Sequence, residues 1–181
     1  MRRRVSVDEV LEFWFADPAR WWKKDPAFDA EIRSRFSELH ELIERGEQED
    51  WRKAPRGALA YVIVLDQFSR NMFRGTARMF ASDARAIAAA RAAIEGGDDQ
   101  ALDPAERTFL YMPFMHSEDH ADQERSVALF QSLSAPDQVR YAEQHRDIVR
   151  RFGRFPHRNE LLGRASTPEE LEFLTQPGSS F

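Results

Sequence analysis

The eight residues Ala58–Leu65 form the longest uninterrupted apolar run of the chain, and this run constrains the fold more than any other feature. As a helix it is apolar on every face, whereas a helix at the surface of a protein carries one polar face. The run is also far too short to span a membrane. We therefore predict a helix at the centre of the fold that is buried on all sides.

This helix is expected to continue through the polar segment Asp66–Gly75. Asp66 and Arg70 are four residues apart, so they share one helix face in the order that favours an ion pair. Arg70 and Arg74 lie near the helix end, where the dipole attracts positive charge. Because a buried charge must be paired or hydrogen-bonded, the segment predicts either an internal ion-pair network or the floor of an anion site.

Helical periodicity extends over almost the whole chain, and no segment sustains the alternation of a β-strand. Helices are expected at about 6–17, 26–45, 58–75, 83–95, 104–116, 119–133, 136–152 and 167–174. The pattern predicts one all-α domain over residues 1–181, built of about eight helices in antiparallel hairpins. The tail 176–181 is expected to be loose.

The segment Phe152–Asn159 is the clearest candidate for a functional loop. Gly153 suits the left-handed position beyond a helix end, and Pro156 cannot continue a helix. Asn159 is a favourable N-cap for a short following turn. Between its phenylalanines the loop carries polar groups suited to binding an anion: Arg154, His157, Arg158 and Asn159. Since ordered loops often hold binding residues, we predict that this one lies over a polar pocket.

Two histidines, His116 and His145, fall on the apolar stripes of their helices. A histidine in such a position is more often a hydrogen-bonded core residue than a catalyst. The alternative is that both share a pocket with His157 and Asp66, where imidazole groups would transfer protons near neutral pH.

His116 and His120 have the four-residue spacing of a helical metal pair. However, Ser117 is expected to cap a new helix between them, and Glu118 and Asp119 then lie in its first turn, where acidic side chains are stabilised. The order of residues also differs from that of the zinc proteases. We therefore predict no metal site, with a mixed histidine and carboxylate site as the less favoured alternative.

Composition excludes several classes of protein. The net charge of −5 and the lack of an RNA-binding aromatic signature argue against nucleic acid as a partner. The chain has no cysteine, which excludes disulfides and thiolate zinc sites. It also has no phosphate-binding glycine loop or dinucleotide fingerprint, so no cofactor is predicted. With no signal-like or membrane-spanning stretch, a soluble cytoplasmic protein without membrane partners is expected, and its oligomeric state stays open.

Four stretches of the chain together resemble an uncharacterised family known as domain of unknown function 924. They are Val10–Phe15, Leu65–Gly75, Phe114–Asp119 and Arg151–Arg164. The resemblance implies an all-helical, tetratricopeptide-like superhelical array and no established reaction. It carries over Asp66, Gln67, Arg70, Asn71, Arg74, His116, Ser117, Glu118, Arg154, His157, Arg158 and Asn159. The family pattern has an apolar residue at the position of His120, which argues against this histidine as a ligand.

The favoured hypothesis is a pocket for an anionic small molecule, with acid–base catalysis as an option. The residues expected to do the chemistry are His116, His145, His157, Asp66 and Glu118, and those expected to bind the ligand are Arg70, Asn71, Arg74, Arg154, Arg158 and Asn159. One alternative is a non-catalytic scaffold that holds a peptide carboxylate in a groove. Another is that the same polar residues only fix how the helices pack.

Overall fold

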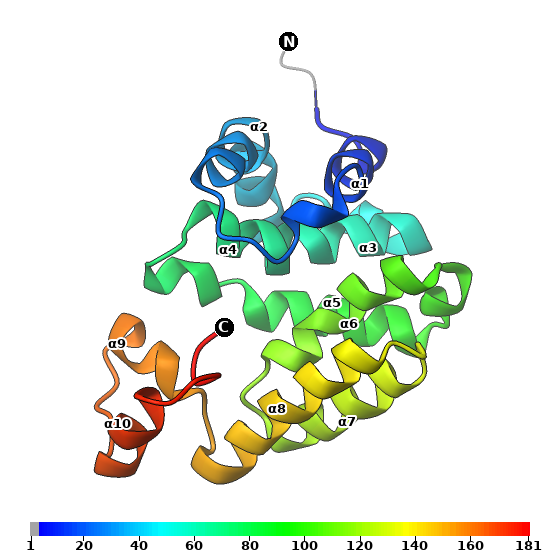
Figure 1. The fold of residues 1–181 in the computed structure, drawn as a ribbon. Coiled ribbons are helices and arrows are strands. Elements are labelled where there is room, and N and C mark those ends of the chain that lie inside the picture. The colour runs from blue at the N-terminus through cyan, green and yellow to red at the C-terminus, as the bar shows by residue number, and fades with distance from the viewer. Residues whose placement is uncertain (1–3) are drawn as a thin grey trace. The chain divides into compact units, whose positions relative to one another are not determined.

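The computed structural model describes residues 4–181, and within this range every regular element is helical (Figure 1). The α-helices are α1 (Val7–Phe15), α2 (Pro26–Glu44), α3 (Pro55–Ile63), α4 (Ser69–Met72), α5 (Asp83–Glu95), α6 (Pro104–His116), α7 (His120–Gln131), α8 (Pro136–Phe152), α9 (Asn159–Leu162) and α10 (Pro168–Leu174). Short 3-10 turns lie at Pro18–Arg20, Glu49–Lys53, Ala77–Phe80, Asp98–Ala101 and Pro156–Arg158. The predicted all-α class is confirmed, whereas the tetratricopeptide-like arrangement stays a prediction.

The described chain divides into two compact units. Unit 1 comprises the chain up to Arg74 together with Arg78–Pro113, and unit 2 comprises Gly75–Ala77 and Phe114–Phe181. The prediction of one domain over residues 1–181 stays a prediction. None of the helices within residues 4–181 combines the length and the apolar character needed to cross a membrane.

The centre of unit 1 is helix α3 together with the turn that follows it. Every residue from 57 to 69 is buried, as the apolar run predicts. Helices α1 and α5 pack against α3, and α2 packs against α4 and the intervening turn. Phe68, at the end of that turn, lies 4.8 Å from Phe36 and 5.8 Å from Trp14, measured between ring centroids. The large aromatic side chains near the N-terminus therefore enclose the central segment.

This central segment is not the single regular α-helix that we predicted. Helix α3 ends at Ile63, and a π-helical turn, Val64–Phe68, connects it to α4. A π turn holds one residue more than an α turn, so it shifts the faces on which later side chains lie. The turn contains the buried side chains of Asp66 and Gln67, whose Oδ2 and Nε2 atoms are hydrogen-bonded at 2.8 Å.

In unit 2, helices α7 and α8 lie side by side and pack against each other (Figure 1). Ile148 and Val149 of α8 form a core with Phe155 of the following loop. Gly153 ends α8 in the left-handed conformation (φ 73°), as its position predicts. The loop is therefore anchored by Phe155, which is completely buried.

Two predicted helix caps are wrong. Asn159 is the first residue of α9 rather than its N-cap, because its side chain bonds Ser166 and Glu170 instead of the helix backbone. Helix α7 is capped by Asp119, not by Ser117. The predicted break is nevertheless present, since α6 ends at His116 before α7 begins at His120.

Candidate functional site

The residues predicted to form a site fall into the two units. Unit 1 contains Asp66, Arg70, Asn71 and Arg74, and unit 2 contains His116, Glu118, His145, Arg154, His157, Arg158 and Asn159.

Arg70 is held mainly by a carboxylate that we did not predict. Its Nη1 and Nη2 atoms donate to Oδ1 and Oδ2 of Asp83 at 2.8 and 3.0 Å. The predicted partner Asp66 is present but farther away, with 3.7 Å between Oδ1 and Nη1. Burial alone would lower the pKa of Arg70, but the charges of Asp66 and Asp83 outweigh it and raise the pKa. The guanidinium charge is thus balanced within unit 1.

Arg74 and Asn71 both bind Asp29 of helix α2. Arg74 donates from Nε at 2.7 Å and from Nη2 at 3.1 Å, and Asn71 donates from Nδ2 at 2.8 Å. The pKa of Arg74 is raised, first of all by its hydrogen bonds with Asp29. A planar guanidinium binds a ligand carboxylate through just such paired bonds. In this protein Asp29 receives them.

In unit 2, Arg154 has the same type of partner. Its Nε and Nη2 atoms donate to Glu170 at 2.9 and 2.8 Å, and Asn159 adds a bond of 3.2 Å from Nδ2. These contacts lower the pKa of Glu170 to about 2, with the Arg154 bonds as the largest cause. Arg154 and Asn159 therefore fasten helix α10 to the loop.

Arg164, which sequence reasoning did not single out as a site residue, is hydrogen-bonded to Glu118 and to two residues of the loop. Its Nη1 atom donates to both carboxylate oxygens of Glu118, at 2.9 and 3.0 Å. Its Nε and Nη2 atoms donate to Oδ1 of Asn159 and to the carbonyl of Phe155, at 2.9 and 3.1 Å. Glu118 also accepts the Phe155 amide at 3.0 Å. The described contacts of Glu118 thus hold the loop in place.

Two of the three histidines predicted as catalysts, His145 and His157, lie around the Phe155 ring. The ring centroid of Phe155 lies 5.6 Å from that of His145 and 5.9 Å from that of His157. The guanidinium carbon of Arg158 lies 4.7 Å from the same centroid, and Arg158 Nη2 donates to the carbonyl of His116 at 2.8 Å. We call His116, His145, His157 and Arg158 the histidine cluster.

His145 is the most perturbed member of the cluster. Burial is the main reason that its pKa falls to about 3, and the positive charges of His116, His157 and Arg158 lower it further. Its ring is therefore neutral at neutral pH. Because Nδ1 lies 2.7 Å from the carbonyl of Tyr141, Nδ1 carries the proton and Nε2 is the acceptor atom.

Arg158 differs from the other candidate arginines in its carboxylate contact. It is only 5% exposed, and its Nη1 atom lies 3.8 Å from Oε1 of Glu118. Glu118 makes its shorter bonds to Arg164, at 2.9 and 3.0 Å. Among these described groups, one carboxylate thus faces two guanidinium groups.

Phe181, at the end of the tail, lies against two rings of the histidine cluster. The ring centroid of Phe181 lies 3.7 Å from His145 and 4.5 Å from His157. Ser179 is buried and donates from Oγ to the carbonyl of Leu174 at 3.2 Å. The tail is thus attached to the end of helix α10 and reaches the cluster with Phe181.

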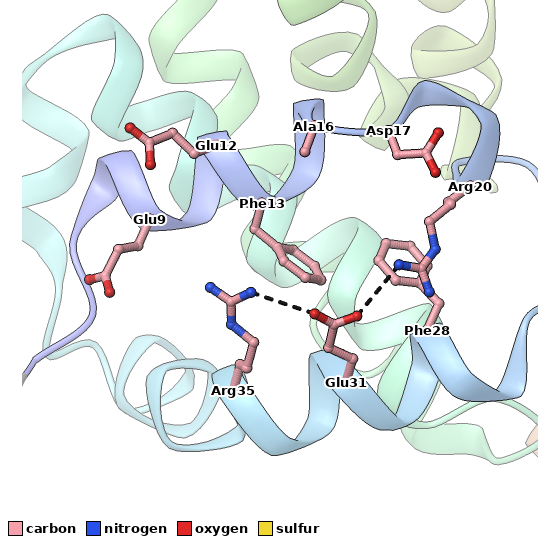
Figure 2. Close-up of a pocket in the computed structure, with 9 residues that line it drawn as sticks. All are labelled: Glu9, Glu12, Phe13, Ala16, Asp17, Arg20, Phe28, Glu31 and Arg35. Carbon is pink, nitrogen blue, oxygen red and sulfur yellow. Dashed lines mark hydrogen bonds and ion pairs between the residues drawn. The ribbon is translucent and has the colours of Figure 1, made fainter.

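A pocket of about 390 Å³ lies in unit 1, and none of the predicted site residues lines it (Figure 2). It is lined by Glu9, Glu12, Phe13, Ala16, Asp17, Arg20, Phe28, Glu31 and Arg35. Glu31 lies between its two arginines, at 3.5 Å from Arg20 and 3.6 Å from Arg35. The guanidinium carbons of these arginines lie 4.0 Å from the Phe28 centroid and 4.6 Å from the Phe13 centroid. The two arginines of this pocket therefore already contact a carboxylate and an aromatic ring of the protein itself.

Within residues 4–181, no group of three or more histidine, aspartate and glutamate side chains is arranged to hold a metal ion. His116 and His120 lie on different helices, α6 and α7. This arrangement follows from the break capped by Asp119.

Sequence reasoning missed three carboxylates that bind candidate arginines: Asp29, Asp83 and Glu170. Each has a position that indicates another role, because Asp29 lies on an amphipathic helix and Asp83 begins one. Glu170 completes the capping box of Thr167, with Oε1 accepting the Thr167 amide at 3.0 Å. Arg164 could have been identified from the sequence, since it lies within a stretch that resembles the family.

The chain matches known proteins of unassigned function. A family described as "Bacterial protein of unknown function (DUF924)" matches residues 10–178. A solved structure of a protein of unknown function from Agrobacterium tumefaciens is 46% identical to the chain, with a TM-score of 0.89. The alignment covers 93% of this chain and 96% of that one. No curated protein gives a significant match.

Proposed function

For this chain, which belongs to the DUF924 family of bacterial proteins of unknown function, we propose that the histidine cluster of unit 2 binds a small organic anion. The observation that carries this proposal is the grouping of His145, His157 and Arg158 around the Phe155 ring, at 5.6, 5.9 and 4.7 Å from its centroid. Arg70, Arg74 and Arg154 each bind an internal carboxylate through paired bonds. Arg158 shares Glu118 with Arg164.

The imidazole rings support an anion next to Arg158. The pKa of His145 is low because of burial and because His116, His157 and Arg158 add positive charge around it. A negatively charged group bound there would relieve this repulsion, since an opposite charge within about 4–6 Å stabilises a cation. The anion is then recognised by charge and by the planar guanidinium together.

The protonation of His145 defines what chemistry the cluster can support. Its Nδ1 proton is donated to Tyr141, so the Nε2 lone pair is available to accept a hydrogen bond or a proton. Burial keeps this ring neutral, but its pKa of about 3 makes it a weak general base at neutral pH. The site would bind anions whether or not a reaction follows.

The test is an NMR titration of the histidine ring signals at pH 7 with acetate, benzoate and inorganic phosphate. At constant ionic strength, we expect saturable shifts of His145, His116 and His157 with at least one of the anions. The Arg158→Gln variant should lose these shifts, because it removes the guanidinium charge. Arg158→Lys should keep part of them, because lysine retains the charge without the planar fork.

The matched control is Arg150→Gln. Arg150 lies on helix α8, is 53% exposed and pairs with Glu124 at the surface. This variant loses the same charge from unit 2, so it should bind the anion as the wild type does. Equal losses in both variants would indicate nonspecific screening and contradict the proposal, as would the absence of a saturable shift with all three anions.

A further inference from the structure

Arg35 lines the pocket of unit 1 and is held there by aromatic rings more than by hydrogen bonds (Figure 2). Its guanidinium carbon lies over the Phe13 ring, 4.6 Å from the centroid, and 5.1 Å from the centroid of Phe36. A guanidinium group stacked on a ring keeps the N–H groups along its edges available. The Nη1 atom lies 3.6 Å from Oε1 of Glu31, which is beyond hydrogen-bond distance. Among the contacts within residues 4–181, Nε and Nη2 of Arg35 have no hydrogen-bond partner.

Nε and Nη2 are the two atoms through which this protein binds carboxylates elsewhere. Arg74 binds Asp29 through this pair at 2.7 and 3.1 Å, and Arg154 binds Glu170 through it at 2.9 and 2.8 Å. The planar edge of a guanidinium matches the two oxygens of a carboxylate. At Arg35 the same pair of donors belongs to a side chain that lines a cavity. A carboxylate from outside the chain can therefore bind there.

The charge of the pocket selects against a ligand that is only an anion. Four acidic and two basic side chains line it, which gives a net charge of −2. Glu9 and Glu12 belong to helix α1 and are three residues apart, so they are neighbours on the helix surface. Glu12 is exposed and has no hydrogen bond or ion pair among the described residues. A carboxylate at Arg35 thus needs a cationic group on the same molecule to match the acidic side chains.

We propose that this pocket binds an amino acid with a basic side chain, whose carboxylate pairs with Arg35 and whose amino groups pair with the carboxylates of α1. The volume of about 390 Å³ falls in the range of small-molecule sites, about 300–1,000 Å³. Phe13 and Ala16 supply apolar surface for the aliphatic part of the ligand. The ligand's net charge of one positive unit offsets part of the negative charge of the pocket. The pocket belongs to unit 1, so this proposal is independent of the histidine cluster in unit 2.

The experiment is isothermal titration calorimetry at pH 7 and constant ionic strength with lysine, 1,5-diaminopentane and norleucine. The second compound lacks the carboxylate of lysine, and the third lacks its side-chain amino group. We expect lysine to bind the wild type at least about tenfold more tightly than either of them, because each lacks one charge-assisted contact. Arg35→Gln should bind lysine no better than 1,5-diaminopentane. Glu12→Gln should weaken the binding of both.

The matched control is Arg45→Gln. Arg45 follows helix α2, is 58% exposed and pairs with Glu47 at 2.7 Å, outside the pocket. This variant loses the same charge from unit 1 and should bind all three compounds as the wild type does. Circular dichroism confirms that each variant is folded, which is expected because Arg35 and Glu12 are at the surface.

Three results would overturn the proposal. The first is the absence of saturable lysine binding to the wild type. The second is equal binding of lysine and norleucine, which would mean that the acidic side chains do not recognise the side-chain amino group. The third is a folded Arg35→Gln variant that keeps the preference for lysine over 1,5-diaminopentane, because the carboxylate would then bind elsewhere.

Discussion

Arg70 and Asp83 bind each other through two parallel hydrogen bonds of 2.8 and 3.0 Å, and Asp66 lies behind them with its side chain fully buried. Three charged groups are thus packed next to the π-helical turn at the centre of unit 1. Removing one of these charges destabilises the folded protein, because it leaves the others buried without compensation.

We therefore expect Arg70→Ala to lower the free energy of unfolding by about 3–5 kcal/mol. The measurement is urea unfolding followed by circular dichroism. Arg140→Ala is the control, since Arg140 pairs with Asp137 at the surface with side-chain exposures of 60% and 74%. It should change the free energy by less than about 1 kcal/mol. Similar small losses in both variants would contradict a buried network around Arg70.

Gly57 tests the close packing of the central helix. A Cβ atom at this position would lie 2.1 Å from the carbonyl oxygen of Trp51, which belongs to the backbone and cannot rotate away. Gly57→Ala should therefore lower the free energy of unfolding by about 3 kcal/mol, although alanine favours helices. Gly96→Ala, whose nearest contact would be 3.3 Å, is the milder comparison. A stabilised Gly57→Ala variant would contradict the packing of α3 against the preceding 3-10 turn.

The low pKa of His145 predicts a specific pH dependence of stability. The unfolded chain takes up a proton near pH 6.5, whereas the folded protein does so only near pH 3, because burial disfavours the charged ring. Stability from this residue is complete above pH 6.5 and decreases as the pH falls towards 3. Between pH 6.5 and 5 the loss is up to about 2 kcal/mol.

Urea unfolding of the wild type and His145→Gln at several pH values between 7 and 5 checks this expectation. The variant should be less stable at pH 7 but should lose less stability on acidification. His40 is also buried with a lowered pKa, so some dependence should remain in the variant. Parallel curves for the two proteins would contradict a buried neutral His145.

Glu170 predicts a second, more acidic step. Its pKa is about 2 in the folded protein against an ordinary value of 4.5, chiefly because Arg154 donates two bonds to it. Stability from this carboxylate is present above pH 4.5 and is lost as the pH falls towards 2. Glu170→Gln should remove this step while leaving the dependence between pH 7 and 5 unchanged. Thermal unfolding of both proteins at pH 6 and pH 3 measures how much stability each loses on acidification. An equal loss in the variant and the wild type would contradict a stabilising, ionised Glu170.

The sequence predicts the helical class and most helix bounds because these depend on local patterns. The apolar run Ala58–Leu65 requires burial on all sides, and Gly153 marks the end of a helix through its conformational freedom. The π-helical turn at Val64–Phe68 was not predicted, because an α turn and a π turn carry the same apolar periodicity over such a short segment.

The polar partners could not be predicted because they come from distant parts of the chain. Asp29 is 45 residues away from Arg74, and Glu118 is 46 residues away from Arg164. Local spacing favoured Asp66 as the partner of Arg70, but Asp83 is closer in the structure. Residue type correctly indicated that these arginines bind carboxylates, but not whether the carboxylate is a ligand or part of the protein.

The most direct test of the central claim compares two arginines of the same loop, Arg158 and Arg154, by isothermal titration calorimetry with benzoate. Arg154 binds Glu170 at 2.8 Å, whereas Arg158 lies in the histidine cluster, 3.8 Å from Glu118. We predict that Arg154→Gln loses stability but retains benzoate binding, and that folded Arg158→Gln binds at least tenfold more weakly, the equivalent of about 1.4 kcal/mol. Unchanged binding by Arg158→Gln, together with loss of binding by a folded Arg154→Gln, would contradict the account.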